Sequence, residues 1–209
     1  MRGRQIIIPT GAVPSKITRL VNIPSNHEAC LLIGGPTHEY PFTELDFIQM
    51  IENFVQFSEL HKFKATVVCS RRTPTLTSKT ISYLQSKNIE LVCPQSSTSI
   101  CDVFKRSEFI FVTEDDSSTM LSESIQTGRV VISVCREDSK TDDIIQAYLD
   151  HQFIQRKTIS QLTDVELTST KIDPKLIETI ITQQLVDDLK AKSKNLSFYQ
   201  SHVSKLKML

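Results

Sequence analysis

Short apolar runs recur along the middle of the chain, and longer stretches with a helical spacing of apolar residues lie between them. A run of four to eight apolar residues between turn signals is typical of a strand buried on both faces of a sheet. The pattern predicts five such strands, at residues 29–35 (ACLLIGG), 65–70 (ATVVCS), 89–94 (IELVCP), 108–113 (EFIFVT) and 129–134 (RVVISV).

Helical signals fill the stretches between these strands. Thr43 and Asp46 have the spacing of a capping pair ahead of an apolar stripe. Thr73 suits the N-cap of a second helix, with Pro74 at its first position, and Gly128 suits the end of a fourth. Further helices are predicted at 99–107, at about 142–151, and from 174 to about 196.

Strands that alternate with helices predict an α/β fold. We expect a Rossmann-like, open and mostly parallel sheet of five or six strands with helices on both faces. Residues 1–26 contain one apolar run and three prolines. They predict an added strand and a linker, ahead of a Rossmann-like domain over residues 27–209 that ends in the long C-terminal helix.

Composition and charge narrow the classes of function. Of the 209 residues, 39% are hydrophobic and 23% charged, which is ordinary for a globular domain with its own core. Twenty-four basic residues balance twenty-four acidic ones, so nothing favours a nucleic-acid partner. No apolar run is long enough to span a bilayer, and a proline cuts the N-terminal run too short for a signal sequence. We expect a cytoplasmic protein.

The cysteines and histidines do not suggest a metal site. The five cysteines include no CxxC pair, and the five histidines do not cluster at ligand spacing. We expect the cysteines to be buried free thiols that act as small hydrophobic side chains.

Three loops should meet at the carboxyl ends of the strands, where ligands of such sheets bind. The first contains Gly34, Gly35, Pro36 and Thr37, whose backbone could approach an anion closely. It has neither the GxGxxG fingerprint nor a P-loop. The second contains Ser70, Arg71 and Arg72, and the two arginines offer forked donors for phosphate. Because an arginine in this place can hold a ribose 2′-phosphate, an NADP-binding domain is one alternative.

The third loop leads into the fourth helix and carries Glu114 and two further acids. Ser117, Ser118 and Thr119 are N-cap candidates at a helix end that attracts phosphate. Glu123 follows one turn later and could accept hydrogen bonds from a ribose diol. The alternative is that Asp115 and Asp116 only cap the helix and that Glu123 is solvated.

The order of four segments resembles a known family. IGGPT (33–37), SRRTP (70–74), VTEDDSSTMLSES (112–124) and TGRVV (127–131) are similar to the carboxyl-terminal half of the mitochondrial fission ELM-like family, of the glycosyltransferase-B superfamily. The resemblance implies that this half binds a nucleoside diphosphate sugar. It implies that Ser117 and Ser118 approach the diphosphate and that Glu123 binds the ribose. It also implies that residues 34–37 face the cleft and that residues 70–72 lie alongside the phosphates.

The resemblance also bears on enzymatic activity. A glycosyltransferase of this type needs two halves, and the segment before Ala29 is too short for the first. We therefore expect a donor-binding domain that is incomplete as an enzyme without a first half, with no cofactor and no assigned catalytic base. The alternative is a degenerate, non-catalytic protein-interaction module. The doubled Asp115–Asp116 and the acidic segment 135–143 favour that alternative.

Overall fold

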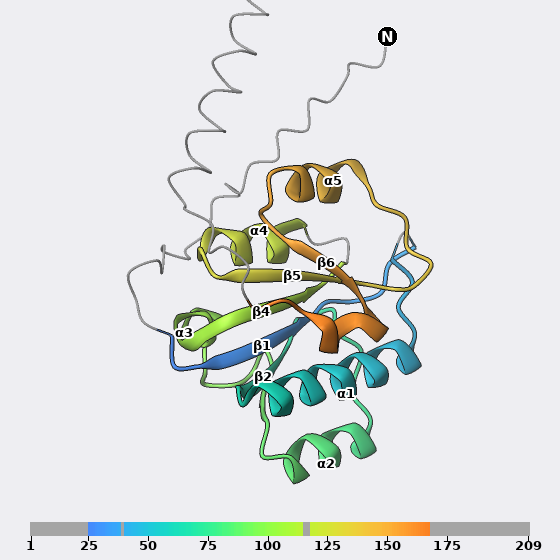
Figure 1. Ribbon diagram of the computed structural model, residues 1–209. Helices are drawn as coiled ribbons and strands as arrows, with labels where there is room; N and C mark the ends of the chain where they lie inside the picture. Colours follow the sequence, from blue (N-terminus) through green and yellow to red (C-terminus); the bar gives the residue numbers. More distant parts are fainter. Residues whose placement is uncertain (1–24, 39, 115–117, 168–209) are drawn as a thin grey trace, which may run out of the picture. The chain divides into compact units, whose positions relative to one another are not determined.

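The computed structural model describes residues 25–38, 40–114 and 118–167, all of which lie in one compact unit. Their centre is a sheet of six parallel strands in the order β3-β2-β1-β4-β5-β6 (Figure 1). The α/β, Rossmann-like prediction is therefore confirmed. The strands are β1 (Glu28–Ile33), β2 (Lys64–Cys69), β3 (Glu90–Val92), β4 (Ser107–Thr113), β5 (Val130–Cys135) and β6 (Gln155–Thr158).

Helices cover both faces of this sheet (Figure 1). The first two helices and the 3-10 turn pack on one face, and the other three helices lie on the opposite face. The helices are α1 (Glu44–His61), α2 (Ser78–Ser86), α3 (Ile100–Arg106), α4 (Ser118–Gln126) and α5 (Asp143–Asp150), and the 3-10 turn is η1 (Ile159–Asp164).

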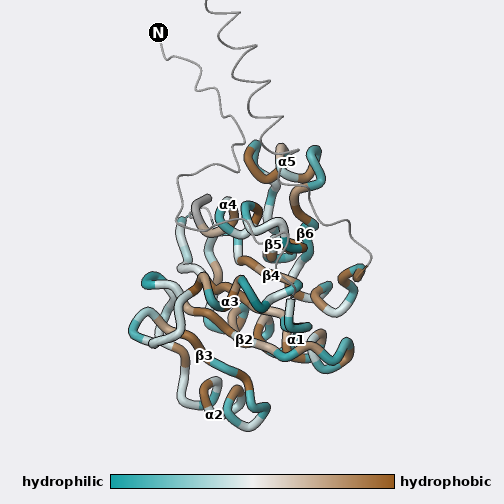
Figure 2. The backbone as a smooth tube through the Cα atoms, turned by 90° about the vertical axis from the view of Figure 1, so that its left-hand side faces the viewer, coloured by the Kyte–Doolittle hydropathy of each residue, from teal (hydrophilic) through white to brown (hydrophobic). Residues whose placement is uncertain are grey.

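The central strand β1 is buried along its whole length, as its apolar run predicts. Side chains of a strand alternate between the two faces of its sheet. Ala29, Leu31 and Ile33 therefore join the core under α1, whereas Cys30 and Leu32 face the opposite helices. In the core under α1, Phe54 and Phe111 meet edge to face with ring centroids 5.2 Å apart. Figure 2 shows hydrophobic stretches of the chain along the central strands of the sheet.

The first helix begins as its sequence predicts. The Thr43 hydroxyl accepts a hydrogen bond from the Asp46 amide, and the Asp46 carboxylate accepts one from the Thr43 amide. Gly128 ends α4 with φ 70°, and its N–H donates to the Ile125 carbonyl. Both ends follow from local chemistry alone, because each needs only residues within three or four positions.

Two elements differ from the sequence-based expectation. The second helix begins at Ser78 with Thr77 as its N-cap, four residues later than predicted. The reason is that Thr73 is used elsewhere: its hydroxyl donates to the Ile33 carbonyl at the end of β1. In addition, β6 is not among the five predicted strands, because it is a short strand of polar residues without an apolar run. The predicted N-terminal strand and the long C-terminal helix lie outside the described residues.

Within the described ranges, no helix is both long and apolar enough to cross a membrane.

Candidate ligand site at the carboxyl edge of the sheet

The strand order reverses at β1, which lies between β2 and β4. In open α/β sheets this reversal leaves room for a ligand beyond the carboxyl ends of the strands. Hydrogen bonds hold the three predicted loops together there. The Gly34 amide donates to the Thr113 hydroxyl oxygen at 2.8 Å, and the Ser70 amide donates to the Ile33 carbonyl at 3.1 Å. The loops after β1, β2 and β4 therefore start from one connected edge.

Gly35 lies directly against the backbone of the loop after β2. A Cβ atom at this position would be 2.4 Å from the Arg72 carbonyl oxygen and 2.7 Å from the Arg72 Cβ. Real Cβ contacts are not that short, and the carbonyl oxygen belongs to the backbone and cannot rotate away. The glycine is therefore required for the two loops to approach each other.

The loop after β2 is a turn that stabilises itself. The Ser70 hydroxyl oxygen accepts from the amides of Arg72 and Thr73 at 3.1 and 3.2 Å, and the Thr73 hydroxyl oxygen accepts from the Ser70 amide at 2.7 Å. These bonds occupy the Ser70 hydroxyl in shaping the turn. They leave the side chains of Arg71 and Arg72 exposed at the sheet edge.

The first loop closes on itself in a similar way. The Thr37 hydroxyl accepts from the Tyr40 amide at 3.1 Å, and the Thr37 amide donates to the Tyr40 carbonyl at 3.0 Å. Pro36 is exposed ahead of this turn. Thr37 therefore stabilises the turn through bonds within the loop, whereas Gly34 and Gly35 are buried at its start.

Glu114, at the end of β4, is buried and paired. Only 3% of the residue is exposed, and Arg156 of β6 donates from Nε to Oε1 at 2.7 Å and from Nη2 to Oε2 at 2.8 Å. The Ser133 hydroxyl adds a third bond to Oε1 at 2.7 Å. This partnership raises the pKa of Arg156 above its ordinary value. Both carboxylate oxygens of Glu114 are thus engaged within the protein.

Arg156 also organises the segment between β5 and α5. Its guanidinium donates to the Thr141 hydroxyl at 3.0 Å and to the carbonyls of Ser139 and Lys140 at 3.3 Å. One side chain therefore fixes the start of the turn after β4 and the loop after β5. The sequence does not predict the role of this arginine, because it lies in a polar segment. The one weak sequence signal for a buried polar group here is Ser133, a serine inside the apolar run of β5.

Glu123 is in a different situation from Glu114. It lies on α4, the helix that leaves the switch point, between buried neighbours, and it is itself partly buried. Among the described residues, no side chain or backbone group forms a hydrogen bond or ion pair with its carboxylate. Ser117, and the side chains of Ser118 and Thr119, lie outside the described residues.

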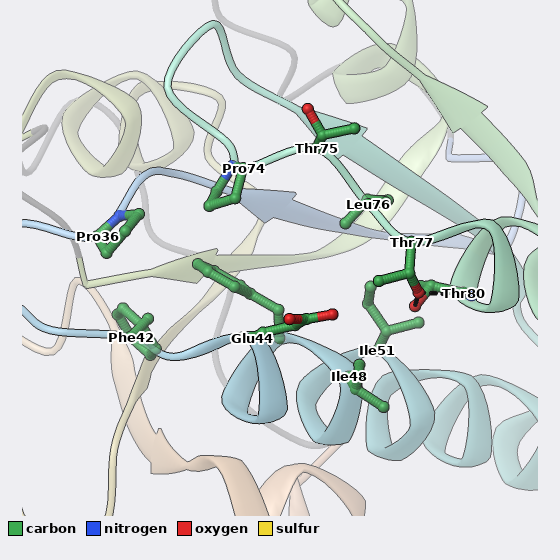
Figure 3. Close-up of a pocket in the computed structure, with 11 residues that line it drawn as sticks. Pro36, Phe42, Glu44, Ile48, Ile51, Pro74, Thr75, Leu76, Thr77 and Thr80 are labelled. Atoms are coloured by element: carbon green, nitrogen blue, oxygen red, sulfur yellow. Dashed lines mark hydrogen bonds between the residues drawn. The ribbon is translucent and has the colours of Figure 1, made fainter.

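Two hollows flank the loop after β1. The first has a volume of about 430 Å³, and Figure 3 shows Pro36 and Phe42 on one side of it, Pro74 and Leu76 across from them, and the carboxylate of Glu44 at its wall. The second is more polar, at about 520 Å³, and His38 and Tyr40 line it together with residues 138–142. One hollow therefore suits an apolar group and the other a polar group.

The loops after β1 and β5 are joined across the second hollow. Arg136 donates from Nη1 to the Pro41 carbonyl at 2.7 Å, and its Nε lies 3.5 Å from an oxygen of Asp46. The Tyr40 hydroxyl forms a hydrogen bond with Asp142, the N-cap of α5. These contacts join two loops whose bonded residues are 95 and 102 positions apart in the sequence.

A sequence model of the family described as "Mitochondrial fission ELM1" matches residues 14–180. Because the match covers well over half of the chain, the protein belongs to this family, as the order of the four segments predicts. No protein with a curated description matches the sequence.

Three solved structures share a related arrangement of strands and helices. An α,α-trehalose-phosphate synthase (UDP-forming) from Burkholderia vietnamiensis is 8% identical, with a TM-score of 0.45 over 82% of this chain and 45% of that one. The UDP-GlcNAc 2-epimerase from Methanocaldococcus jannaschii is 12% identical (TM-score 0.43, 80% and 48%). The O-GlcNAc transferase mutant K341M from Thermobaculum terrenum is 11% identical (TM-score 0.41, 76% and 31%).

This chain thus spans less than half of the length of each of these structures.

Proposed function

We propose that the domain binds a nucleoside diphosphate sugar at the carboxyl edge of the sheet, in the manner of the donor-binding half of a glycosyltransferase-B enzyme. The observation that carries the proposal is the Glu123 carboxylate, which is partly buried on the helix leaving the switch point and has no partner among the described residues. A partly buried carboxylate beside the switch point can accept hydrogen bonds from a ligand that covers it. A ribose diol has two hydroxyl groups that can donate such hydrogen bonds.

The diphosphate is assigned to the other loops. The exposed guanidinium groups of Arg71 and Arg72 can each make charge-assisted, forked hydrogen bonds to phosphate oxygens. Gly34 and Gly35 bring the backbone of the first loop close to the same edge. We assign further contacts with the diphosphate to the start of α4, where unpaired helix N–H groups favour an anion. The residues proposed there are Ser117, Ser118 and Thr119.

Glu114 has a supporting role in this proposal. Its oxygens are bound to Arg156 and Ser133, so it shapes the turn in front of α4 and does not contact the ligand. Transfer of the sugar would need a second half that provides the acceptor site, because a donor domain alone lacks the opposite wall of a cleft. We assign no catalytic base to the described residues.

Thermal unfolding of the full chain with millimolar UDP, GDP, CDP, ADP and NADP tests this proposal. Ligand at about 100 times its dissociation constant adds roughly 2.7 kcal/mol to the free energy of unfolding, which raises the Tm of a domain this size by about 5–10 °C. We expect a rise that selects one base, that disappears in Glu123→Gln, and that persists in Glu166→Gln, an exposed glutamate beyond η1.

The possible outcomes separate the candidate functions. The donor-site proposal would be refuted if none of the nucleotides changes the Tm, or if Glu123→Gln responds to the ligand as the unaltered chain does. A response to NADP alone that is lost in Arg72→Ala would instead support the NADP-binding alternative.

A second candidate function is a protein-interaction module. The observation in its favour is the apolar hollow between α1 and the loop before α2, together with Leu45 on the same helix, which is 60% exposed. Under this alternative, nucleotides have no effect on the Tm, and Ile48→Asp at the hollow abolishes recovery of a partner without unfolding the domain.

A further inference from the structure

Two cysteines lie side by side at the carboxyl edge of the sheet. Cys69 is the last residue of β2, and Cys93 follows β3 directly. The two strands are parallel and in register, with Val68 opposite Val92. The next positions along both strands are Cys69 and Cys93. Neighbouring strands are about 4.8 Å apart, and a disulfide spans Cα separations of roughly 4.4–6.8 Å.

The same register places both thiols on one face. Val67 and Leu91 are opposite each other and both pack on the core under α1. Side chains two positions further along a strand return to the same face. Cys69 is also paired with Ile33 of β1, another member of that core. The two thiols therefore point from adjacent strands to the same side of the sheet.

These two cysteines are not enclosed like the others of the sheet. Cys30 and Cys135 are buried, as the sequence predicts, whereas Cys69, Cys93 and Cys101 are only partly buried. The expectation of five buried thiols is thus wrong for three of them. Because a thiol reacts only where a reagent can reach it, Cys69 and Cys93 combine proximity with access.

The environment assigns different roles to the two thiols. Burial, together with the neighbouring Cys93, raises the pKa of Cys69 to about 12. Cys69 is therefore protonated near neutral pH and is a poor first nucleophile. We therefore expect an oxidant to react first with Cys93.

We propose that Cys69 and Cys93 form a reversible intramolecular disulfide by exchange with a small disulfide such as glutathione disulfide. The Cys93 thiolate attacks one sulfur of the small disulfide and releases one thiol. The sulfur of Cys69 then loses its proton, attacks the Cys93 sulfur of the mixed disulfide and releases the second thiol. The protein loses two protons and two electrons, and the small disulfide takes them up to become two thiols.

The bond would connect two loops at the sheet edge. Cys69 immediately precedes the turn that presents Arg71 and Arg72, and Cys93 begins the segment leading to α3, where its amide donates to the Ser96 hydroxyl at 2.9 Å. Oxidation would therefore tie the arginine-bearing turn to the neighbouring strand. This inference does not depend on the proposed nucleotide site.

The test treats the full, reduced chain with graded glutathione disulfide and glutathione, followed by acid quenching, alkylation and peptide mass mapping. We expect a product in which the peptides of Cys69 and Cys93 are linked and no glutathione is retained, reversed by dithiothreitol. In Cys69→Ser, closure is impossible, so glutathione should remain on Cys93. Cys101→Ser, which removes a partly buried thiol on α3, should leave the linkage unchanged.

Two results would overturn the proposal. One is that Cys93 in the unaltered chain keeps its glutathione to the same extent as in Cys69→Ser. The other is that Cys101 reacts fully while Cys69 and Cys93 stay unlinked at every ratio of disulfide to thiol. Should Cys69→Ser fail to fold, Cys69→Ala provides the same comparison.

Discussion

Replacing Arg156 by alanine should destabilise the protein far more than an ordinary charge deletion. The side chain of Glu114 is 1% exposed and that of Arg156 17%, and their bidentate contact is 2.7 and 2.8 Å long. Removing one partner of a buried pair leaves the other charge buried without compensation, which costs about 3–5 kcal/mol. For a domain of this size, that loss lowers the Tm by roughly 6–20 °C.

Urea and thermal unfolding of the full chain, followed by circular dichroism, would measure this loss. Lys87→Ala is a matched control, because Lys87 contacts Glu59 at a similar 2.8 Å but the two side chains are 38% and 57% exposed. Exposed pairs contribute little to stability, so the control should leave the Tm nearly unchanged. The double variant Glu114→Met with Arg156→Met should recover much of the loss, since it buries no unpaired charge. An Arg156→Ala variant as stable as the Lys87→Ala control would refute the reasoning.

Three further predictions concern the loops and helix starts. Gly35→Ala should cost at least about 1–3 kcal/mol by overpacking against the Arg72 carbonyl, and a urea midpoint equal to that of the unaltered chain would contradict the close approach. Thr43→Ala should cost about 0.5–2 kcal/mol by removing the cap of α1, measured by the same unfolding, with Thr43→Ser restoring most of it. The Ser99 hydroxyl lowers the pKa of Asp102, so this carboxylate stabilises the fold above its unfolded pKa and ceases to do so as the pH falls through its folded pKa. Carboxyl NMR titration of Ser99→Ala should move the Asp102 pKa back towards its ordinary value, and an unmoved value would contradict the assigned cause.

The sheet could be predicted from the sequence because its signals are local. Each of the five predicted strands is an apolar run, and a run such as that of β1 can be buried only between two layers of helices. The capping residues of α1 need no information beyond four positions. Once the strands alternate with helices, the parallel arrangement follows from the way such connections pack.

The parts that could not be predicted depend on partners distant in the sequence. Thr73 has the ordinary features of an N-cap, but its hydroxyl bonds to the Ile33 carbonyl, forty positions away, and the helix begins later. Glu114 has the features of a ligand residue beside a helix, but Arg156 approaches it from a strand that carries no apolar signal. The pairing of Cys69 and Cys93 likewise requires the register of two strands, which spacing alone does not give.

The position of β1 in the sheet has a consequence for synthesis of the protein on the ribosome. The strand is made first among the described strands, but one of its two neighbours, β4, is complete only at Thr113. Until then, one edge of a strand that is buried along its whole length in the folded domain has no partner, and a parallel neighbour can reach it only through a long connection. A nascent chain that stops before β4 therefore exposes an unpaired strand edge that can pair with other chains. Chaperones cover surfaces of this type. The centre of the domain can close only when more than half of the chain has left the ribosome.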